Sequence, residues 1–243
     1  MRLGSCVLFI NNYCYLSYKW NFWRPLGTLT NVLKSLDEYE VDEIFLLRPI
    51  KGEDKNDSWN RDLREIKQIK LSTPLSFGGG IRSLSRLNSL KNLPVERLVF
   101  SNSMINPSKK DSILINRAIS EFGRQAIVSL LPYKILKDEF FFYSSQKRDF
   151  IKLSKENFEI IDRMSNEIIL YDAQHEGLKD KINLGVLSSL EFEESKIILS
   201  GGIGPSSIKS LNKNSSIAAI YLDNSTLFKE QTIKKLKRHA GLS

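Results

Sequence analysis

A glycine-rich turn occurs twice in this chain, and the spacing of its two copies constrains the fold more than any other feature. The first copy reads LSFGGGIR over Leu75–Arg82, and the second reads LSGGIG over Leu199–Gly204. Gly79 and Gly201 are 122 residues apart, which is half of the 243 residues of the chain. Each copy ends a short apolar run and precedes a segment with helical spacing. A repeat of this length indicates two similar halves.

Two further pairs of segments repeat at almost the same spacing. An Asn-Ser pair closes an apolar run in each half, 122 residues apart, and a glutamate begins an apolar run in each half, 124 residues apart. These positions are Asn102-Ser103 with Asn224-Ser225, and Glu43 with Glu167. We therefore expect one domain over 1–243, built from half-repeats at about 1–121 and 122–243.

Apolar runs of strand length alternate with segments of helical periodicity along the whole chain. No Pro/Gly-rich linker divides it, so the pattern predicts an α/β fold, a (β/α)8 TIM barrel built from two half-barrel repeats. An aromatic loop or hairpin is expected at Tyr13–Trp20, a short strand in an excursion at Phe140–Tyr143, and a helix at Phe150–Ile161. The predicted barrel strands are Cys6–Ile10, Glu43–Leu47, Thr73–Phe77, Arg97–Ser101, Gln125–Leu131, Glu167–Tyr171, Lys196–Leu199 and Ala218–Leu222.

Charge and composition narrow the class of protein. The formal net charge is +8, which suits either nucleic acid or a phosphorylated ligand, but the lysines are spread along the chain and not gathered in one stripe. We therefore expect no nucleic-acid partner. No apolar run approaches the about 20 residues of a membrane span, and no secretory signal is visible, so a cytoplasmic protein without a membrane partner is expected.

Cysteine and histidine are scarce. Cys6 and Cys14 are expected to be buried thiols of a reducing compartment. With only His175 and His239 in addition, no spacing typical of a metal site or a nucleophilic triad occurs. We expect no metal and no cofactor.

The two glycine turns are candidate phosphate-binding corners, because glycine lets the backbone approach an anion closely and a following helix presents free N–H groups. Tight turns without a ligand are the alternative. Two corners on opposite sides of a barrel mouth would suit an elongated ligand with a phosphate at each end. The candidate phosphate-binding residues are Gly79, Gly80, Asn102, Ser103, Gly201, Gly202, Asn224 and Ser225.

The segments at 73–83 and 198–204 resemble those of the cyclase subunit (HisF) of imidazole glycerol phosphate synthase, and the resemblance covers essentially the whole chain. It implies a lyase of histidine biosynthesis. It also implies that the barrel forms a heterodimer with a glutaminase (HisH-like) subunit, receives ammonia from it through an internal channel, and closes the imidazole ring of a bisphosphorylated substrate.

The chain departs from that family where the family places its catalytic acids. The two aspartates that end the first and fifth strands correspond here to Phe9 and Leu131, and no Asp or Glu lies within 7–12 or 126–134. Arg48 replaces the acid expected after the second strand. Glu176 keeps a carboxylate after the sixth strand, either as a weak catalytic candidate or as a contact at the rim.

At the amino-terminal end of the predicted barrel, the sequence departs less from that family. Glu43 and Glu167 match the family's two ammonia-gate glutamates, Arg97 matches the gate lysine, and Arg2 lies near the gate arginine. Solvated charges at strand starts are the alternative. The aromatic loop at 19–27 also resembles a divergent branch of the family found with bacterial surface-polysaccharide genes.

Three functions remain open, and whether the chain is an enzyme is not decided by its residues. The first is a barrel subunit of a glutamine amidotransferase system that receives ammonia but lacks the usual cyclase acids. The second is a working cyclase of histidine biosynthesis that uses other residues. The third is a non-catalytic scaffold that binds a phosphosugar or activates a glutaminase.

Overall fold

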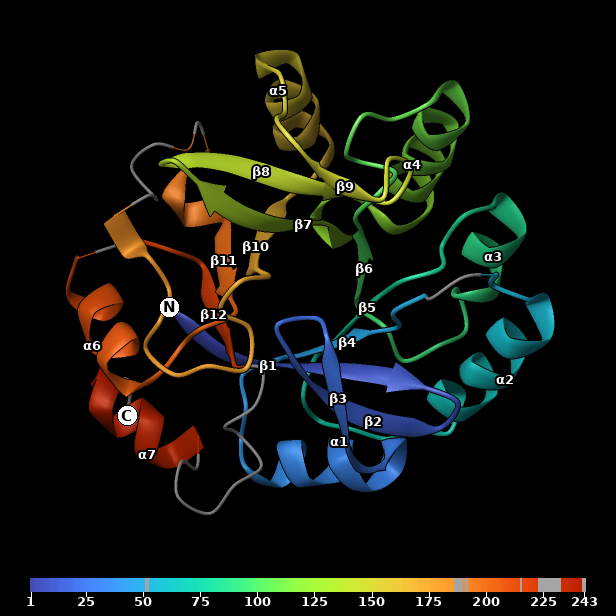
Figure 1. Ribbon diagram of the computed structural model, residues 1–243. Helices are drawn as coiled ribbons and strands as arrows, with labels where there is room; N and C mark the ends of the chain where they lie inside the picture. The colour runs from blue at the N-terminus through green and yellow to red at the C-terminus, as the bar shows by residue number, and fades with distance from the viewer. Residues whose placement is uncertain (51–52, 186–189, 191, 215, 223–232, 242–243) are drawn as a thin grey trace.

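A computed structural model gives the fold, and it describes residues 1–50, 53–185, 190, 192–214, 216–222 and 233–241. Parallel strands pair with their neighbours around a closed ring, and the pairings β12–β1 and β7–β10 complete the circle (Figure 1). The predicted α/β barrel is confirmed. In circular order the barrel strands are β1 (Arg2–Ile10), β4 (Ile44–Leu47), β5 (Leu75–Gly78), β6 (Arg97–Phe100), β7 (Ile127–Leu136), β10 (Glu167–Asp172), β11 (Ile197–Ser200) and β12 (Ala219–Leu222).

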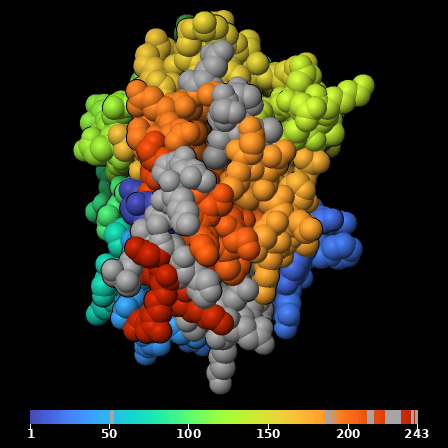
Figure 2. Space-filling view, turned by 90° about the vertical axis from the view of Figure 1, so that its left-hand side faces the viewer, coloured from blue at the N-terminus to red at the C-terminus, as the bar shows by residue number. Residues whose placement is uncertain are grey.

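Helices surround the barrel (Figure 1), and Figure 2 looks onto the face on which two of them, α6 and α7, lie in orange and red. None of the helices described is long and apolar enough to cross a membrane. The helices are α1 (Leu29–Glu38), α2 (Asn56–Lys67), α3 (Leu84–Ser89), α4 (Lys109–Phe122), α5 (Lys155–Met164), α6 (Pro205–Asn214) and α7 (Ile233–Ala240), with 3-10 turns η1 (Arg124–Ala126) and η3 (Glu194–Lys196).

Two antiparallel hairpins interrupt the β/α alternation. β2 (Tyr13–Tyr18) and β3 (Phe22–Thr28) follow β1, and β8 (Glu139–Ser144) and β9 (Asp149–Ile151) follow β7. The hairpin expected after the first strand is therefore present. Both β1–β2 and β7–β8 are joined by two residues with positive φ, a conformation whose twist matches that of paired strands.

The helix predicted from Phe150 begins later. Phe150 belongs to β9, and α5 starts only at Lys155 because Ser154 and Asn157 form a reciprocal capping box at that point. The strand pairs Phe150 with Tyr143 of β8. Tertiary pairing has thus replaced helical propensity over the first residues of the predicted helix.

Side chains of the barrel strands alternate between two apolar cores. The outer core, between strands and helices, contains Leu3, Val7 and Phe9 of β1. The inner core fills the barrel lumen with three large rings at 0–1% exposure, those of Phe45, Tyr171 and Tyr221. The buried members of the inner core are Cys6, Phe45, Val99, Val128, Leu130, Ile169, Tyr171, Ile198, Ala219 and Tyr221. This alternation decides which strand residues face the functional site.

Candidate functional site

A cavity of about 410 Å³ lies at the carboxyl-terminal mouth of the barrel, where barrels of this kind place their sites. It is lined by residues in or just beyond β1, β4, β5, β6, β7 and β10. The first glycine corner and the turn after β6 contribute one polar side of the lining: Gly79, Gly80, Arg82, Ser101, Asn102 and Ser103. The structure thus brings four of the predicted phosphate-binding residues, Gly79, Gly80, Asn102 and Ser103, into one cavity.

The first corner can be built only from glycine. Gly79 and Gly80 have φ of +100° and +88°. A Cβ on Gly79 would lie 1.9 Å from the backbone oxygen of Arg48, and a Cβ on Gly80 would lie 2.9 Å from the Arg48 guanidinium. The backbone is therefore held against the loop after β4, with its open side toward the cavity.

A buried charge cluster supports this corner from behind. Arg48 donates from Nε to Asp62 at 2.6 Å and from Nη1 to Asp54 at 2.8 Å. Arg86 donates to Asp54 and, at 2.9 Å, to the backbone oxygen of Gly80. Both guanidinium groups lie over the ring of Trp59. Arg86 thus fastens the corner directly, and Arg48 supports it through the shared partner Asp54. Sequence patterns do not reveal this cluster, because Asp54 precedes α2, Asp62 lies on α2 and Arg86 lies on α3.

The second corner has similar backbone angles but different surroundings. Gly201 and Gly202 have φ of +88° and +71°, and neither lines the cavity at the mouth. A Cβ on Gly201 would lie 2.5 Å from the oxygen of Asp172, and one on Gly202 would lie 2.8 Å from the Cβ of His175. The other two predicted residues of this corner, Asn224 and Ser225, lie outside the described residues.

The positions assigned to the missing aspartates need a correction. Phe9 and Leu131 are fully buried in the outer core and do not face the mouth. The side chains that line the cavity from these strands are their neighbours Leu8 and Pro132. The expected register was wrong by one residue on both strands, because the residues around both positions are apolar and hydrophobicity alone does not show which face points inward. Neither Leu8 nor Pro132 can transfer a proton.

Among the described residues that line the cavity, Glu176 is the one carboxylate, and groups of the protein itself bond both of its oxygens. Oε2 accepts hydrogen bonds from Ser17 Oγ at 2.7 Å and from the Trp20 backbone N–H at 2.8 Å. Oε1 accepts from the hydroxyl of Tyr171. The side chain of Glu176 is 1% exposed. These contacts connect the β2–β3 hairpin to the loop after β10. The role of Glu176 that they support is therefore structural.

A closed ring of ion pairs covers the amino-terminal mouth. Arg2 contacts Glu43 at 3.2 Å and Glu167 at 2.6 Å, and Arg97 contacts the same two glutamates at 2.9 Å and 2.7 Å. The glutamate side chains are 2% and 9% exposed. The three residues predicted for an ammonia gate are thus adjacent, and Arg2 completes the ring.

The lumen above this ring is filled. Tyr221 donates a hydrogen bond to Glu43, and its ring lies against Gly4, where a Cβ would approach within 2.7 Å. Its ring centroid is 5.9 Å from that of Phe45. Burial raises the pKa of Glu43, partly opposed by Arg2 and Arg97, and burial together with Glu43 raises the pKa of Tyr221. Both groups therefore hold their protons more firmly than in water.

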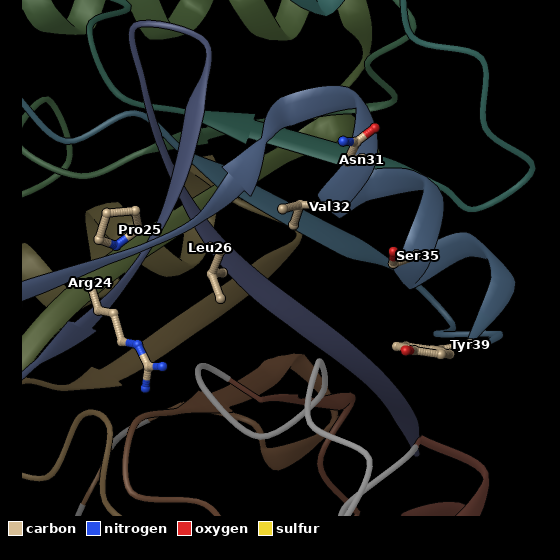
Figure 3. Close-up of a pocket in the computed structure, with 7 residues that line it drawn as sticks. All are labelled: Arg24, Pro25, Leu26, Asn31, Val32, Ser35 and Tyr39. Carbon is tan, nitrogen blue, oxygen red and sulfur yellow. The ribbon is translucent and has the colours of Figure 1, made fainter.

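A second depression, of about 310 Å³, lies between β3 and α1 (Figure 3). None of the predicted site residues lines it. Its lining residues are Arg24, Pro25, Leu26, Asn31, Val32, Ser35 and Tyr39. We assign it no part in the site at the mouth.

Comparison with known proteins gives consistent matches. The family model described as histidine biosynthesis protein matches residues 24–229. A Campylobacter jejuni protein, provisionally named imidazole glycerol phosphate synthase subunit hisF2, is 23% identical over all of this chain and 97% of its own length. An Exiguobacterium protein named imidazole glycerol phosphate synthase subunit HisF is 26% identical over 85% of this chain and 82% of its own. A Campylobacter concisus protein of the same name is 28% identical over 57% of this chain and 55% of its own.

Proposed function

Because this chain belongs to the histidine biosynthesis protein family, we propose that it is the barrel subunit of a glutamine amidotransferase system, and that it lacks the family's ring-closing step. The relatives named above are HisF subunits of a synthase, which supports a partner subunit. The observation that carries the proposal is the contrast between the two mouths of the barrel. The amino-terminal mouth has a closed ring of charges, whereas the described lining of the carboxyl-terminal cavity offers one carboxylate, Glu176, whose oxygens are already bonded.

The ion-pair ring supports the place of the partner. Its members come from β1, β6 and β10 and from the residue before β4, so it closes the barrel where a glutaminase subunit would dock. The two arginines and two glutamates balance, so the ring has no formal net charge and would not attract ammonium over ammonia. In the closed state the ring and Tyr221 block the lumen. Ammonia transfer along the axis would require both to move on docking.

The carboxyl-terminal mouth argues against the ordinary cyclase chemistry. A positioned acid or base contributes about 10²–10⁴-fold to a rate, and two facing strands here offer Leu8 and Pro132 instead. Glu176 is engaged by Ser17, Trp20 and Tyr171. The mouth can hold a phosphorylated ligand at Gly79 and Gly80, but its described lining offers no pair of groups that could exchange protons with both ends of a closing ring.

Docking can be tested with a glutaminase subunit from the same genome. We expect a one-to-one heterodimer by analytical ultracentrifugation and a rise in glutamine hydrolysis of about tenfold or more. Glu96→Lys, at an exposed position beside Arg97, should weaken the heterodimer about tenfold. Glu159→Lys on α5 reverses an exposed charge away from the barrel mouths and should have no effect. Absence of any complex would refute the docking.

A working cyclase is the second candidate, and the names of the curated relatives favour it. Ring closure is best measured with ammonium salt and the bisphosphorylated substrate of the HisF relatives, so that no glutaminase is needed. We expect a rate at least about 10⁴-fold below that of a HisF relative assayed in parallel. Ring closure at a comparable rate would establish the cyclase and overturn our proposal.

A further inference from the structure

The tip of the β2–β3 hairpin crosses the carboxyl-terminal mouth and is fastened to the far side. The Trp20 backbone N–H and the Ser17 hydroxyl both donate to Glu176, and the Lys19 N–H donates to the Glu176 backbone oxygen at 3.2 Å. The Trp20 ring lies 6.0 Å from the ring of Tyr171 on β10. Backbone, side-chain and ring contacts together fix this crossing, which we call the Trp20–Glu176 bridge.

The circular strand order shows what the bridge separates. It runs from the hairpin after β1 to the loop after β10, and β11 and β12 lie between those two strands on one side of the ring. The remaining strands, β4 to β7, lie on the other side. The cavity of about 410 Å³ follows this division, because its lining includes residues of or beyond β1, β4 to β7 and β10, and none among the described residues of β11, β12 or 201–204.

Behind the bridge, the chain itself covers the second corner. The backbone N–H groups of Lys181 and Ile182 donate to the oxygen of Gly202 at 2.9 Å and 3.2 Å. The Asp180 carboxylate accepts from the backbone N–H and the hydroxyl of Ser207 at 2.7 Å and 2.9 Å, at the start of α6. A negative group therefore already satisfies the helix end that follows this corner.

The open compartment combines one phosphate corner with an aromatic wall. Trp20, Trp23, Tyr143 and Tyr171 line it, and the Trp20 and Tyr143 rings meet edge to face with centroids 5.3 Å apart. Side chains of this kind present flat faces to a ring. Gly79 and Gly80, with the exposed cation Arg82 beside them, belong to the same cavity.

We propose that this compartment binds a phosphomonoester that carries one phosphate at the Gly79–Gly80 corner and a ring against the aromatic wall, and that it does not bind a ligand with a phosphate at each end. The proposal rests on the proposed function for the presence of a phosphorylated ligand. It differs from the bisphosphate that the two glycine corners predict from the sequence. The phosphate is bound by the first corner, and Arg82 supplies the charge.

The number of phosphate sites tests the proposal, with inorganic phosphate as the probe and calorimetry and crystal soaking as the measurements. We expect one phosphate per chain, at the first corner. Arg82→Gln should weaken binding about tenfold, whereas the matched variant Lys181→Gln, which removes an exposed cation beside Gly202, should change it less than about twofold. A phosphate at the second corner in the soaked crystal, or equal losses in both variants, would overturn the proposal.

The ring is tested with AMP, which carries one phosphate, a sugar and an aromatic base. We expect AMP to bind about tenfold more tightly than inorganic phosphate and to quench tryptophan fluorescence, and Trp23→Leu should remove most of that advantage while phosphate binding is kept. Equal affinities for AMP and phosphate would overturn the aromatic part. Failure of both probes to bind would overturn the whole inference, whereas the glutaminase experiment would still decide the proposed docking.

Discussion

At the scale of single residues, Arg97 is the member of the ion-pair ring whose loss should matter most. One of its nitrogens contacts both glutamates of the ring. Nη1 lies 2.9 Å from Glu43 and 2.7 Å from Glu167. Its removal leaves two mostly buried carboxylates with Arg2 as their only charged partner within the described part of the ring. Such a buried ion-pair ring adds little net free energy of folding. Removing one member is nevertheless strongly destabilising, because it leaves a buried charge unpaired.

We predict that Arg97→Met lowers the free energy of unfolding by about 2–4 kcal/mol, measured by urea denaturation. The double variant with Glu43→Gln should lose less than the sum of the two single variants, because the buried charge is then removed together with its partner. Lys152→Met, which breaks an ion pair with Glu139 whose side chains are 56% and 57% exposed, is the control and should cost under about 0.5 kcal/mol. Equal losses in both arginine and lysine variants would contradict the prediction.

Cys14 gives a prediction about pH. Burial raises the pKa of its thiol from 9.0 to about 12, so the folded chain keeps a proton that the unfolded chain releases above pH 9. The free energy of unfolding should therefore fall as pH rises from about 9 toward 12, by up to about 1.4 kcal/mol per pH unit from this group. Cys14→Ala should show a shallower fall over that range by urea denaturation, and an unchanged slope would refute the assignment.

At the scale of elements, one carboxylate makes several of the contacts that hold the tip of the β2–β3 hairpin. Glu176 accepts from Ser17, Trp20 and Tyr171, and all three donors would be left without this acceptor in Glu176→Ala. Unsatisfied buried donors cost about 1–3 kcal/mol each. The hairpin tip therefore depends on a residue more than 150 positions away in the chain.

We predict that Glu176→Ala increases amide hydrogen exchange over 13–28 while exchange in β10 and β11 stays unchanged. Glu176→Gln keeps one acceptor oxygen and should retain most of the protection. A loss of protection spread over the whole barrel would mean that Glu176 stabilises the fold globally, and not the bridge.

The sequence predicts where the strands lie better than it predicts which of their side chains point into the barrel. The eight barrel strands were predicted close to their observed positions because apolar runs alternate with helical segments. The faces of β1 and β7 were assigned wrongly, since Phe9, Leu131 and their neighbours are all apolar. The position of Arg2 could have indicated the inward face of β1. Arg2 belongs to the ion-pair ring, and the residues at even spacing from it (Gly4, Cys6 and Leu8) lie on the same, inward side of the strand.

Long-range partners account for what the sequence could not reveal. The ring residues Glu43, Arg97 and Glu167 carry a family pattern, so they could be selected in advance. The ion pairs of Arg48 with Asp54 and Asp62, 6 and 14 positions away, depend on the path of the chain between β4 and α2. The contact of Trp20 with Glu176 depends on the closure of the barrel and on hairpin geometry. No local periodicity records such contacts.

At the scale of the whole molecule, the barrel lumen is packed from the ion-pair ring to the cavity. Tyr221 is central to this packing, since it touches Gly4, hydrogen-bonds Glu43 and packs against Phe45. An axial route for ammonia would pass through the space that this ring occupies. The closed barrel therefore keeps its two mouths separate.

We predict that Tyr221→Ala lowers the free energy of unfolding by about 3–5 kcal/mol, as for other large buried side chains, and opens a lumen cavity visible in a crystal structure. Tyr221→Phe keeps the ring and loses only the hydrogen bond to Glu43, so it should cost about 1 kcal/mol. Equal costs for the two variants would show that the ring does not fill the lumen.

The Trp20–Glu176 bridge has a consequence for symmetry. The two glycine corners follow the third and seventh strands of the ring, so a barrel of two identical halves would offer two equivalent sites. Turned by half a revolution, the bridge would join the β8–β9 hairpin to the loop after β4, but there Arg48 is bound to Asp62 and Asp54 instead. One carboxylate thus breaks the twofold equivalence, and once the sites differ, selection can change either one without changing the other.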